Sequence, residues 1–303
     1  MSARPCAWCI KRNIALKLAL GTVQFGLPYG IANQAGQTSK SEAQHILRCA
    51  RNAGIDTLDT AIGYGDSEAI LGGIGVNDWA VISKLPAIPP SCSNVTEWVI
   101  SSVQESLGRL NISSLSAILL HRANQLLEEH GFELYRALVS LKEQGLVDKI
   151  GISIYEPEEL DAILPLYQMD LIQAPFNVFD QRLIKTKWIS RLKDKGVELH
   201  VRSAFLQGLL LMKGEDRPQK FDKWNGIWEC YDNWLLQNNL SRLQACIRYP
   251  LSFDGISRVI IGVENQLQLN EIITASIGSA PSLSDGVSVD DIELINPAFW
   301  PEL

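Results

Sequence analysis

The chain of 303 residues is 46% hydrophobic and carries a formal net charge of −7 at neutral pH. It is long enough for one (β/α)8 TIM barrel, which takes about 250 residues, and it has no apolar run of about 18 residues that could span a bilayer. The acidic balance, without a Lys/Arg cluster, argues against nucleic acid or an anionic membrane as a partner.

We expect residues 1–15 to form a poorly ordered extension and residues 16–303 to form the barrel. The extension contains Cys6 and Cys9, but one CxxC pair cannot supply four zinc ligands, and the strand and helix of a thioredoxin-like motif do not surround it. Lys17 interrupts the only apolar run near the N-terminus, so a secretory signal is a poor interpretation. Because the six cysteines are scattered along the chain, we expect a reducing, cytoplasmic location.

Short apolar runs alternate with longer amphipathic runs along the rest of the chain. The apolar runs predict strands at residues 16–21, 57–59, 80–83, 115–120, 149–153, 171–173, 198–202 and 258–261. The amphipathic runs predict helices at residues 40–53, 66–71, 96–110, 132–144, 158–166, 183–195, 228–238, 242–249 and 266–276. Because parallel strands need crossover connections, this order predicts a closed (β/α)8 barrel in a single domain.

Four polar residues lie at or just beyond the ends of successive predicted strands. Asp59 ends one strand and Tyr64 lies in the loop after it, Lys84 follows the next strand, and His121 follows the one after that. Taken singly, each has an ordinary structural explanation, such as a solvated lysine or a packed tyrosine. In a parallel barrel, however, the loops after the strands gather on the face that carries active sites. The sequence therefore places all four residues on that face.

The same residues carry a resemblance to a known family. Asp59-Thr-Ala-x-x-Tyr64, the Ser-Lys pair at 83–84 and the Leu-His pair at 120–121 resemble the Asp, Tyr, Lys and His tetrad of the aldo-keto reductases. Further similar runs lie at residues 21–26, 151–153, 171–173 and 261–269. The resemblance extends over about residues 18–276, which is nearly the whole chain.

The resemblance implies an NAD(P)H-dependent oxidoreductase that reduces an aldehyde or ketone to an alcohol. Tyr64 would donate the proton, Lys84 would stabilise the phenolate, Asp59 would orient Lys84, and His121 would donate a second hydrogen bond to the carbonyl oxygen. A phenol, with an ordinary pKa of about 10, needs such a partner to act at neutral pH. No metal motif such as HExxH is visible in the sequence, so a nicotinamide is the expected hydride source.

A set of cofactor-binding residues is also implied by the resemblance. Ser153 and Gln173 match positions that hold the nicotinamide carboxamide, but Ile154 stands where the family has Asn. Arg202 stands where an aromatic residue usually covers the ring, and its guanidinium could stack there or bind the pyrophosphate. The other expected cofactor contacts are Gly21, Thr22, Ser203, Leu206, Gln207, Gly208, Gly262, Glu264 and Gln268.

Glu264 bears on which nicotinamide is used. The family commonly has a basic or hydroxyl residue near this place, which accepts the 2′-phosphate of NADPH, the usual cofactor. A carboxylate repels phosphate but can accept a hydrogen bond from a ribose hydroxyl, so NADPH and NADH both remain candidates. A helix-opening Glu that touches no ligand is the ordinary alternative.

The substrate is less constrained by the sequence. We expect Val23, Phe25, Arg122 and the stretch after the seventh strand to line its pocket, with Trp224 and Trp228 as candidate lids. Next to His121, Arg122 could meet an anionic group, although a salt bridge at the strand end is the commoner outcome. The tail at residues 296–301 resembles the closing segment of bacterial members, some found with surface-sugar biosynthesis, which suggests a sugar or nucleotide-sugar carbonyl.

Two other functions deserve comparison. A regulatory or scaffold subunit that binds a nicotinamide cofactor with little turnover would explain the departures at Ile154 and Arg202, but it would not require all four catalytic residue types. A barrel lyase with Lys84 as a Schiff base would leave Tyr64 and Gln173 unexplained. The reductase is therefore the preferred hypothesis.

Overall fold

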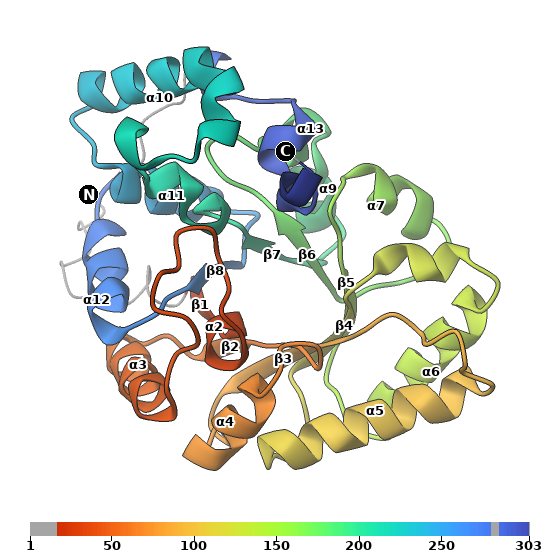
Figure 1. Cartoon of the computed structure of the whole chain (residues 1–303). Helices are drawn as coiled ribbons and strands as arrows, with labels where there is room; N and C mark the ends of the chain where they lie inside the picture. Colours follow the sequence, from red (N-terminus) through yellow and green to blue (C-terminus); the bar gives the residue numbers. More distant parts are fainter. Residues whose placement is uncertain (1–16, 280–284, 303) are drawn as a thin grey trace, which may run out of the picture.

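The computed structural model of the chain describes residues 17–279 and 285–302, so the expectations for residues 1–15, with Cys6 and Cys9, fall on residues outside these ranges. Within the described residues, parallel strands form a closed barrel in chain order (Figure 1). The strands are β1 (Leu18–Gly21), β2 (Thr57–Asp59), β3 (Ala80–Leu85), β4 (Ala117–Leu120), β5 (Ile150–Ser153), β6 (Leu171–Pro175), β7 (Glu198–Arg202) and β8 (Arg258–Gly262). The predicted (β/α)8 barrel is confirmed.

The register of the strands decides which side chains meet. Gly21 of β1 lies opposite Asp59 of β2 on one side and opposite Gly262 of β8 on the other. In the same way Ser153 lies opposite Gln173, and Pro175 lies opposite Arg202. Because all strands run in the same direction, their carboxyl ends share one face of the barrel.

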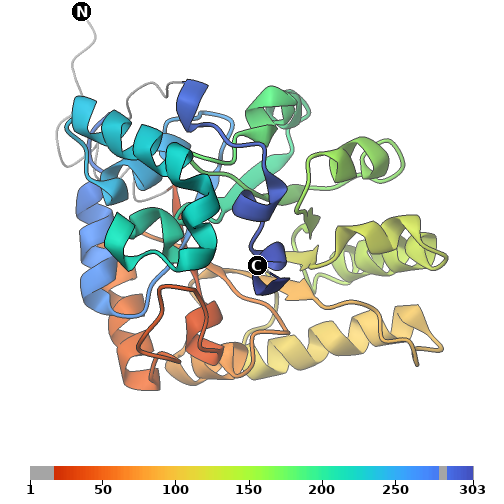
Figure 2. The same cartoon turned by 45° about the horizontal axis from the view of Figure 1, so that its top comes forward.

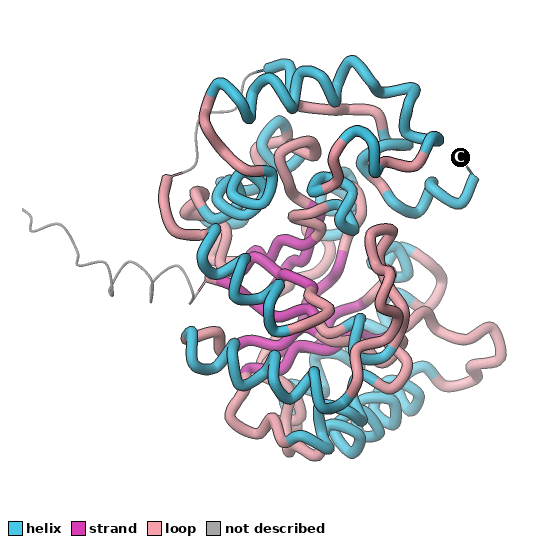
Figure 3. Tube along the Cα trace, turned by 60° about the vertical axis from the view of Figure 1, so that its left-hand side comes forward, coloured by secondary structure: helices cyan, strands magenta, loops and turns pink. Residues whose placement is uncertain are grey.

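Helices surround the ring of strands (Figure 3). They are α2 (Val23–Gly26), α3 (Lys40–Ala53), α4 (Ser67–Ile74), α5 (Val95–Leu110), α6 (Gly131–Glu143), α7 (Glu158–Ile163), α8 (Arg182–Lys185), α9 (Trp188–Asp194), α10 (Asn225–Gln237), α11 (Arg242–Leu251), α12 (Gln266–Ala275) and α13 (Ile292–Ile295). Helix α3 is capped at its N-terminus by Ser39, whose hydroxyl accepts a hydrogen bond from the Glu42 backbone amide. At its C-terminus it is capped by Gly54, which has a φ of 92°. A left-handed glycine is the usual way to stop a helix.

Two elements differ from the expectation. The single helix predicted for residues 183–195 is wrong, because the chain forms α8 and then α9 with a break at Lys187. Lys187 has a φ of 59°, which no helix can continue, and a lysine gives no warning of this conformation in a sequence. The short helix α2 follows β1 directly and was not predicted, since four residues are too few to show a helical period.

The segment from residue 285 to 302 packs against part of the helical layer (Figure 2). The indole of Trp300 meets the ring of Phe221 edge-on at 5.1 Å, and the indole nitrogen of Trp224 donates to Asp291 at 2.8 Å. Trp224 and Trp228 are therefore buried, with 5% and 2% of their surface exposed. The prediction that these two tryptophans act as lids is wrong.

Three further features concern the cysteines, the lengths of the helices and metal-ligand groups. The cysteines of the described segments, Cys49, Cys92, Cys230 and Cys246, are free thiols. In the same segments, each helix is too short or too polar to cross a bilayer. Residues 17–279 and 285–302 bring together no group of three or more His, Cys, Asp or Glu side chains suited to a metal ion.

Candidate active site

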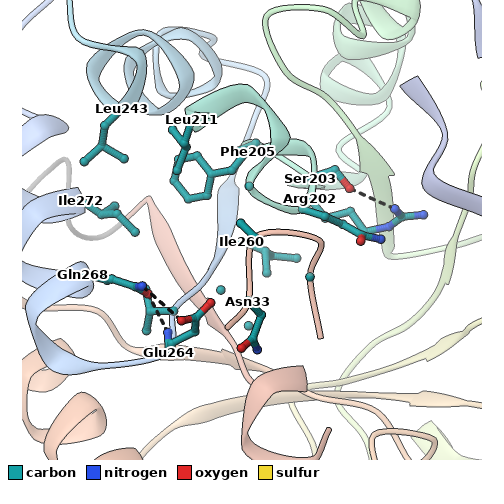
Figure 4. A pocket seen from close by; sticks show the side chains of 18 of the residues that line it. Asn33, Arg202, Ser203, Phe205, Leu211, Leu243, Ile260, Glu264, Gln268 and Ile272 are labelled. Atoms are coloured by element: carbon teal, nitrogen blue, oxygen red, sulfur yellow. Dashed lines mark hydrogen bonds between the residues drawn. The ribbon is translucent and has the colours of Figure 1, made fainter. Parts of the chain in front are cut away.

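A cleft of about 1020 Å³ opens at the carboxyl ends of the strands. Its floor is formed by strand ends, including Gly21, Asp59 and Gln173, and its far wall by residues of α10, α11 and α12. Figure 4 shows apolar side chains that face the cleft, namely Leu243 and Ile272 from the far wall, Phe205 and Leu211 from the segment after β7, and Ile260 from β8. The cleft is thus polar at the barrel mouth and largely apolar above it.

A buried ion pair lies under the floor of the cleft. The Lys84 ammonium donates to Asp59 Oδ1 at 2.6 Å and to the Thr60 carbonyl at 2.8 Å, and Lys84 is only 1% exposed. Asp59 Oδ2 accepts a hydrogen bond from the side-chain Nε2 of Gln173 at 2.6 Å. The side-chain Oε1 of Gln173 in turn accepts from the Ser153 hydroxyl at 3.2 Å. These contacts fix the Asp59 carboxylate between two donors.

The pKa of Lys84 reflects two opposed effects. Burial by itself would lower the pKa of the ammonium, but the carboxylate of Asp59 and the phenol of Tyr64 outweigh burial and raise it above the ordinary value. Lys84 is therefore a fixed positive charge. It also lies 5.1 Å from the centre of the Tyr64 ring.

Tyr64 and His121 lie together at the cleft surface above this charge. Their rings meet edge-to-face, with centres 5.8 Å apart and planes at 78°. The backbone amide of His121 donates to the Leu85 carbonyl, which fixes His121 beside the end of β3. Burial, the Lys84 ammonium and the Arg202 guanidinium lower the pKa of His121 to about 4. The imidazole is therefore neutral at neutral pH and can donate one hydrogen bond.

The site residues proposed from the sequence converge on this cleft with three exceptions. Lys84 and Ser153 lie behind the lining residues, where they contact Asp59 and Gln173, and Leu206 is fully buried in the core. The others line the cleft: Gly21, Thr22, Asp59, Tyr64, His121, Gln173, Arg202, Ser203, Gln207, Gly208, Gly262, Glu264 and Gln268.

Glu264 and Gln268 mark one end of the cleft, at the start of α12. The Glu264 amide donates to Gln268 Oε1 at 2.8 Å, and Gln268 Nε2 donates to Glu264 Oε2 at 3.5 Å. Figure 4 shows this pair on one side of the cleft and Arg202 with Ser203 on another. The helix itself is capped by Asn265, whose side chain accepts from the Gln268 amide. Because Asn265 satisfies the helix terminus, the Glu264 carboxylate is not needed as a cap.

The cleft has two further features that suit a bound ligand. Gln24 lines it, and Gln24 Oε1 is buried without a hydrogen-bond partner among the described residues. A side chain at Gly262 would come within 2.7 Å of the Gln24 side-chain amide, so glycine at this position leaves room for Gln24 in the lining of the cleft. A buried acceptor without a partner is costly unless a ligand or water satisfies it.

The sequence did not reveal the contribution of residues 27–38 to the cleft. Tyr29 accepts from Gln207 Nε2 at 3.1 Å, and the Ala32 amide donates to the Gln207 carbonyl at 3.4 Å. Ser203 and Gln207 themselves have φ values of 63° and 53°, a strained conformation for residues other than glycine. The turn residues around Gly30 signal a loop, but nothing in them indicates which segment the loop meets.

The pocket residues proposed for the substrate have mixed outcomes. Val23 lines the cleft, as predicted. Phe25 has none of its surface exposed and packs in the core, and Arg122 forms an ion pair with Glu128 at the protein surface. The predicted pocket roles of Phe25 and Arg122 are therefore wrong.

Known proteins share this sequence pattern and this fold. The family model described as "Aldo/keto reductase family" matches residues 17–281. An uncharacterized oxidoreductase of Bacillus subtilis, YqkF, is 27% identical over 286 residues, which cover 86% of this chain and 90% of that protein. D-arabinose 1-dehydrogenase of Saccharomyces cerevisiae is 24% identical over 285 residues, with 82% of each chain covered. Among solved structures, an aldo-keto reductase of Bacillus halodurans in its holo form has a TM-score of 0.68 at 20% identity, with 88% of each chain covered.

Proposed function

Because this chain belongs to the aldo/keto reductase family and is related to oxidoreductases, we propose that it is an NAD(P)H-dependent enzyme that reduces an aldehyde or ketone to an alcohol. The observation that carries the proposal is the buried pair of Lys84 and Asp59 beneath Tyr64. A buried ion pair is weak evidence for stability, since a well-packed apolar pair would serve as well. Placed under a cleft and beside a phenol, it has a chemical use.

The proposed chemistry assigns one task to each polar side chain. Reduction of a carbonyl places negative charge on its oxygen, which donors in the cleft must meet. Tyr64 donates the proton to that oxygen, and the Lys84 ammonium stabilises the phenolate that results. Asp59 holds Lys84 in place and offsets the cost of burying its charge. His121, being neutral, donates a hydrogen bond to the same oxygen without delivering a competing proton.

The cleft suits a nicotinamide dinucleotide, which supplies the hydride when bound. The cleft lining includes both Tyr64 and Glu264, and Gln24 Oε1, which lacks a partner among the described residues, belongs to a side chain that lies against Gly262. Gln173 and Gly262 would hold the ligand from the floor, and Gln207 and Gly208 from above. We propose NADH as the preferred form, because the Glu264 carboxylate repels a 2′-phosphate and can accept from ribose hydroxyls.

A sugar or nucleotide-sugar carbonyl is the proposed substrate class, supported only by the resemblance of the tail at residues 296–301. The proposed location is the cytoplasm, and the proposed barrel domain begins at residue 16. The alternative of a regulatory subunit with little turnover rests on Arg202, which stands where the family has an aromatic residue, and on Ile154, whose side chain is buried and offers the cleft no amide. Measurable reduction of a carbonyl substrate distinguishes a reductase from a regulatory subunit.

The test is Tyr64→Phe, with oxidation of NADH and NADPH followed at their absorbance band for a panel of aldehydes and ketones. We expect kcat to fall by about a hundredfold to ten-thousandfold, the usual share of general acid catalysis, while nucleotide binding is retained. Tyr135→Phe is the matched control, because the Tyr135 hydroxyl meets only the Gln168 carbonyl at the surface. Equal rates for Tyr64→Phe and the wild type would contradict the assignment of Tyr64.

A further inference from the structure

Arg202 is a positive charge in the cleft without an acidic partner. It ends β7, is half-buried and lines the cleft beside Tyr64 and His121. The other arginine of the cleft lining, Arg242, is paired with Asp232. None of the ion pairs formed within residues 17–279 and 285–302 includes Arg202. Because the guanidinium of Arg202 is partly exposed in the cleft, its charge is open to water or to an anionic ligand.

The guanidinium of Arg202 is held in one orientation. One terminal nitrogen donates to the Ile154 carbonyl at 2.9 Å, and the other donates to the Ser203 hydroxyl at 3.4 Å. Its central carbon lies 4.5 Å from the centre of the Tyr155 ring, in cation–π contact. A guanidinium has about five N–H donors, so these two bonds leave donors available for a ligand.

Arg202 acts on the catalytic end of the cleft. Its charge is one of the causes, after burial and Lys84, of the lowered pKa of His121. Its side chain is separated from the pair of Glu264 and Gln268, which lies at another side of the cleft (Figure 4). Among the described residues that line the cleft, Arg202 and Lys213 are cations without an ion pair, and Arg202 lies away from the acidic end of the cleft.

We propose that Arg202 binds an anionic group of the substrate, so that the preferred substrates are aldehydes or ketones that carry a carboxylate or a phosphate. This inference rests on the proposed reductase function. A planar guanidinium recognises such groups through two parallel hydrogen bonds, which fixes their orientation as well as their position. The substrate would be anchored at Arg202 with its carbonyl directed to Tyr64 and His121. The diphosphate of the nucleotide is the other possible source of the same chemistry.

The experiment compares para-carboxybenzaldehyde with its neutral amide, para-formylbenzamide, which has nearly the same size. The measured quantity is the ratio of kcat/KM for the acid to that for the amide within each variant, so that effects on nucleotide binding or stability cancel. We expect the wild type to favour the acid by about tenfold or more, and Arg202→Gln to lower this ratio by about 10-fold to 100-fold. Arg202→Lys keeps the positive charge but not the two parallel N–H donors of the guanidinium. We therefore expect its ratio of kcat/KM for the acid to that for the amide to be intermediate.

Arg136→Gln is the matched control, because Arg136 is exposed on α6 and does not line the cleft. Its ratio should equal that of the wild type. A wild type that does not favour the acid, or an unchanged ratio in Arg202→Gln, would overturn the inference. If the NADH dissociation constant of Arg202→Gln rises while the ratio stays the same, the anion is the nucleotide's diphosphate.

A failure of the reductase function would look different, because neither aldehyde would be turned over. The inference is then decided by calorimetric titration of the wild type, in the presence of NADH, with para-(hydroxymethyl)benzoate and para-(hydroxymethyl)benzamide. Binding of the benzoate about tenfold more tightly than the amide, lost in Arg202→Gln, supports the inference. Equal binding of the two compounds rejects it.

Discussion

At the scale of single residues, the chemistry of Lys84 depends on where β3 ends. The ammonium is buried, and only the carboxylate of Asp59 on the neighbouring strand makes that burial tolerable. Removing Asp59 would leave a buried charge unpaired, which is among the more costly changes in a protein. The stability of the buried Lys84 therefore depends on Asp59.

Glu264 provides the prediction about cofactor preference. Glu264→Arg replaces a charge that repels a 2′-phosphate with one that attracts it, so the ratio of KM for NADPH to KM for NADH should fall by about tenfold or more. The two Michaelis constants are measured from initial rates with one aldehyde. Glu143→Arg is the control, because Glu143 is exposed at the end of α6, far from the cleft lining. An unchanged ratio in Glu264→Arg would leave Glu264 without a role in binding.

The sequence revealed some of these residues and concealed others for physical reasons. Asp59, Lys84 and His121 were found because strand ends can be read from short apolar runs, and strand ends share a face. Tyr29 was missed because its contact with Gln207 joins two loops, and loops have no period that indicates their partner. Trp224 was misassigned because a sequence cannot show which tail segment will cover an aromatic ring.

At the scale of elements, the short helix α2 supports the loop that carries Tyr64. It packs against the start of α4, and Gly26 at its end lies directly on the Tyr64 backbone. A methyl group on Gly26 would come within 1.7 Å of the Tyr64 carbonyl oxygen, which is far inside van der Waals contact. The position of the phenol is thus set by the last residue of a short helix whose first two residues line the cleft.

Gly26→Ala should therefore lower both stability and kcat. The backbone around Tyr64 has to shift, at a cost of about 1–3 kcal/mol, and the phenol moves with it. Urea denaturation and initial rates measure the two effects. Gly108→Ala is the control, because Gly108 lies in α5 with no atom near the position of the added methyl group. We expect it to stabilise the protein by about 0.5–1 kcal/mol with unchanged kcat. Full activity in Gly26→Ala would show that α2 does not position the loop.

At the scale of the whole molecule, the barrel depends on a segment distant in sequence from the site. Residues 285–302 cover aromatic side chains that include Phe221 and Trp224, and Leu294 and Ile295 are themselves buried. The start of this segment, at residues 285–287, also packs against α10, which forms part of the far wall of the cleft. The far wall is therefore supported from behind by the C-terminal segment.

Trp300→Ala removes the largest side chain of this segment. Trp300 is 4% exposed and its indole nitrogen donates to the Leu294 carbonyl, so we expect a loss of about 3–5 kcal/mol in the free energy of unfolding. Phe299→Ala is the neighbouring control, because Phe299 is 38% exposed and should cost less than about 1 kcal/mol. Urea denaturation of both variants gives the comparison. Similar losses in the two would mean that the segment is not packed as described.

The overall architecture was the most predictable feature. Eight alternating units leave few arrangements open once parallel strands and right-handed crossovers are required. The break at Lys187 was not predictable, because it depends on one backbone angle and the surrounding composition remains helical. Sequence period thus determines which elements form, and tertiary packing determines where some of them are interrupted.

The division of labour between strands and loops has an evolutionary consequence. Asp59 and Lys84 belong to strands whose removal would open the ring, whereas Phe205 and Gln207 belong to the connection after β7, which can lengthen or change without disturbing the ring. Related chains could therefore differ in their exposed connections while keeping the same ring of strands. We therefore expect amino-acid substitutions to accumulate slowly at residues under the floor of the cleft and faster in the connections along its rim.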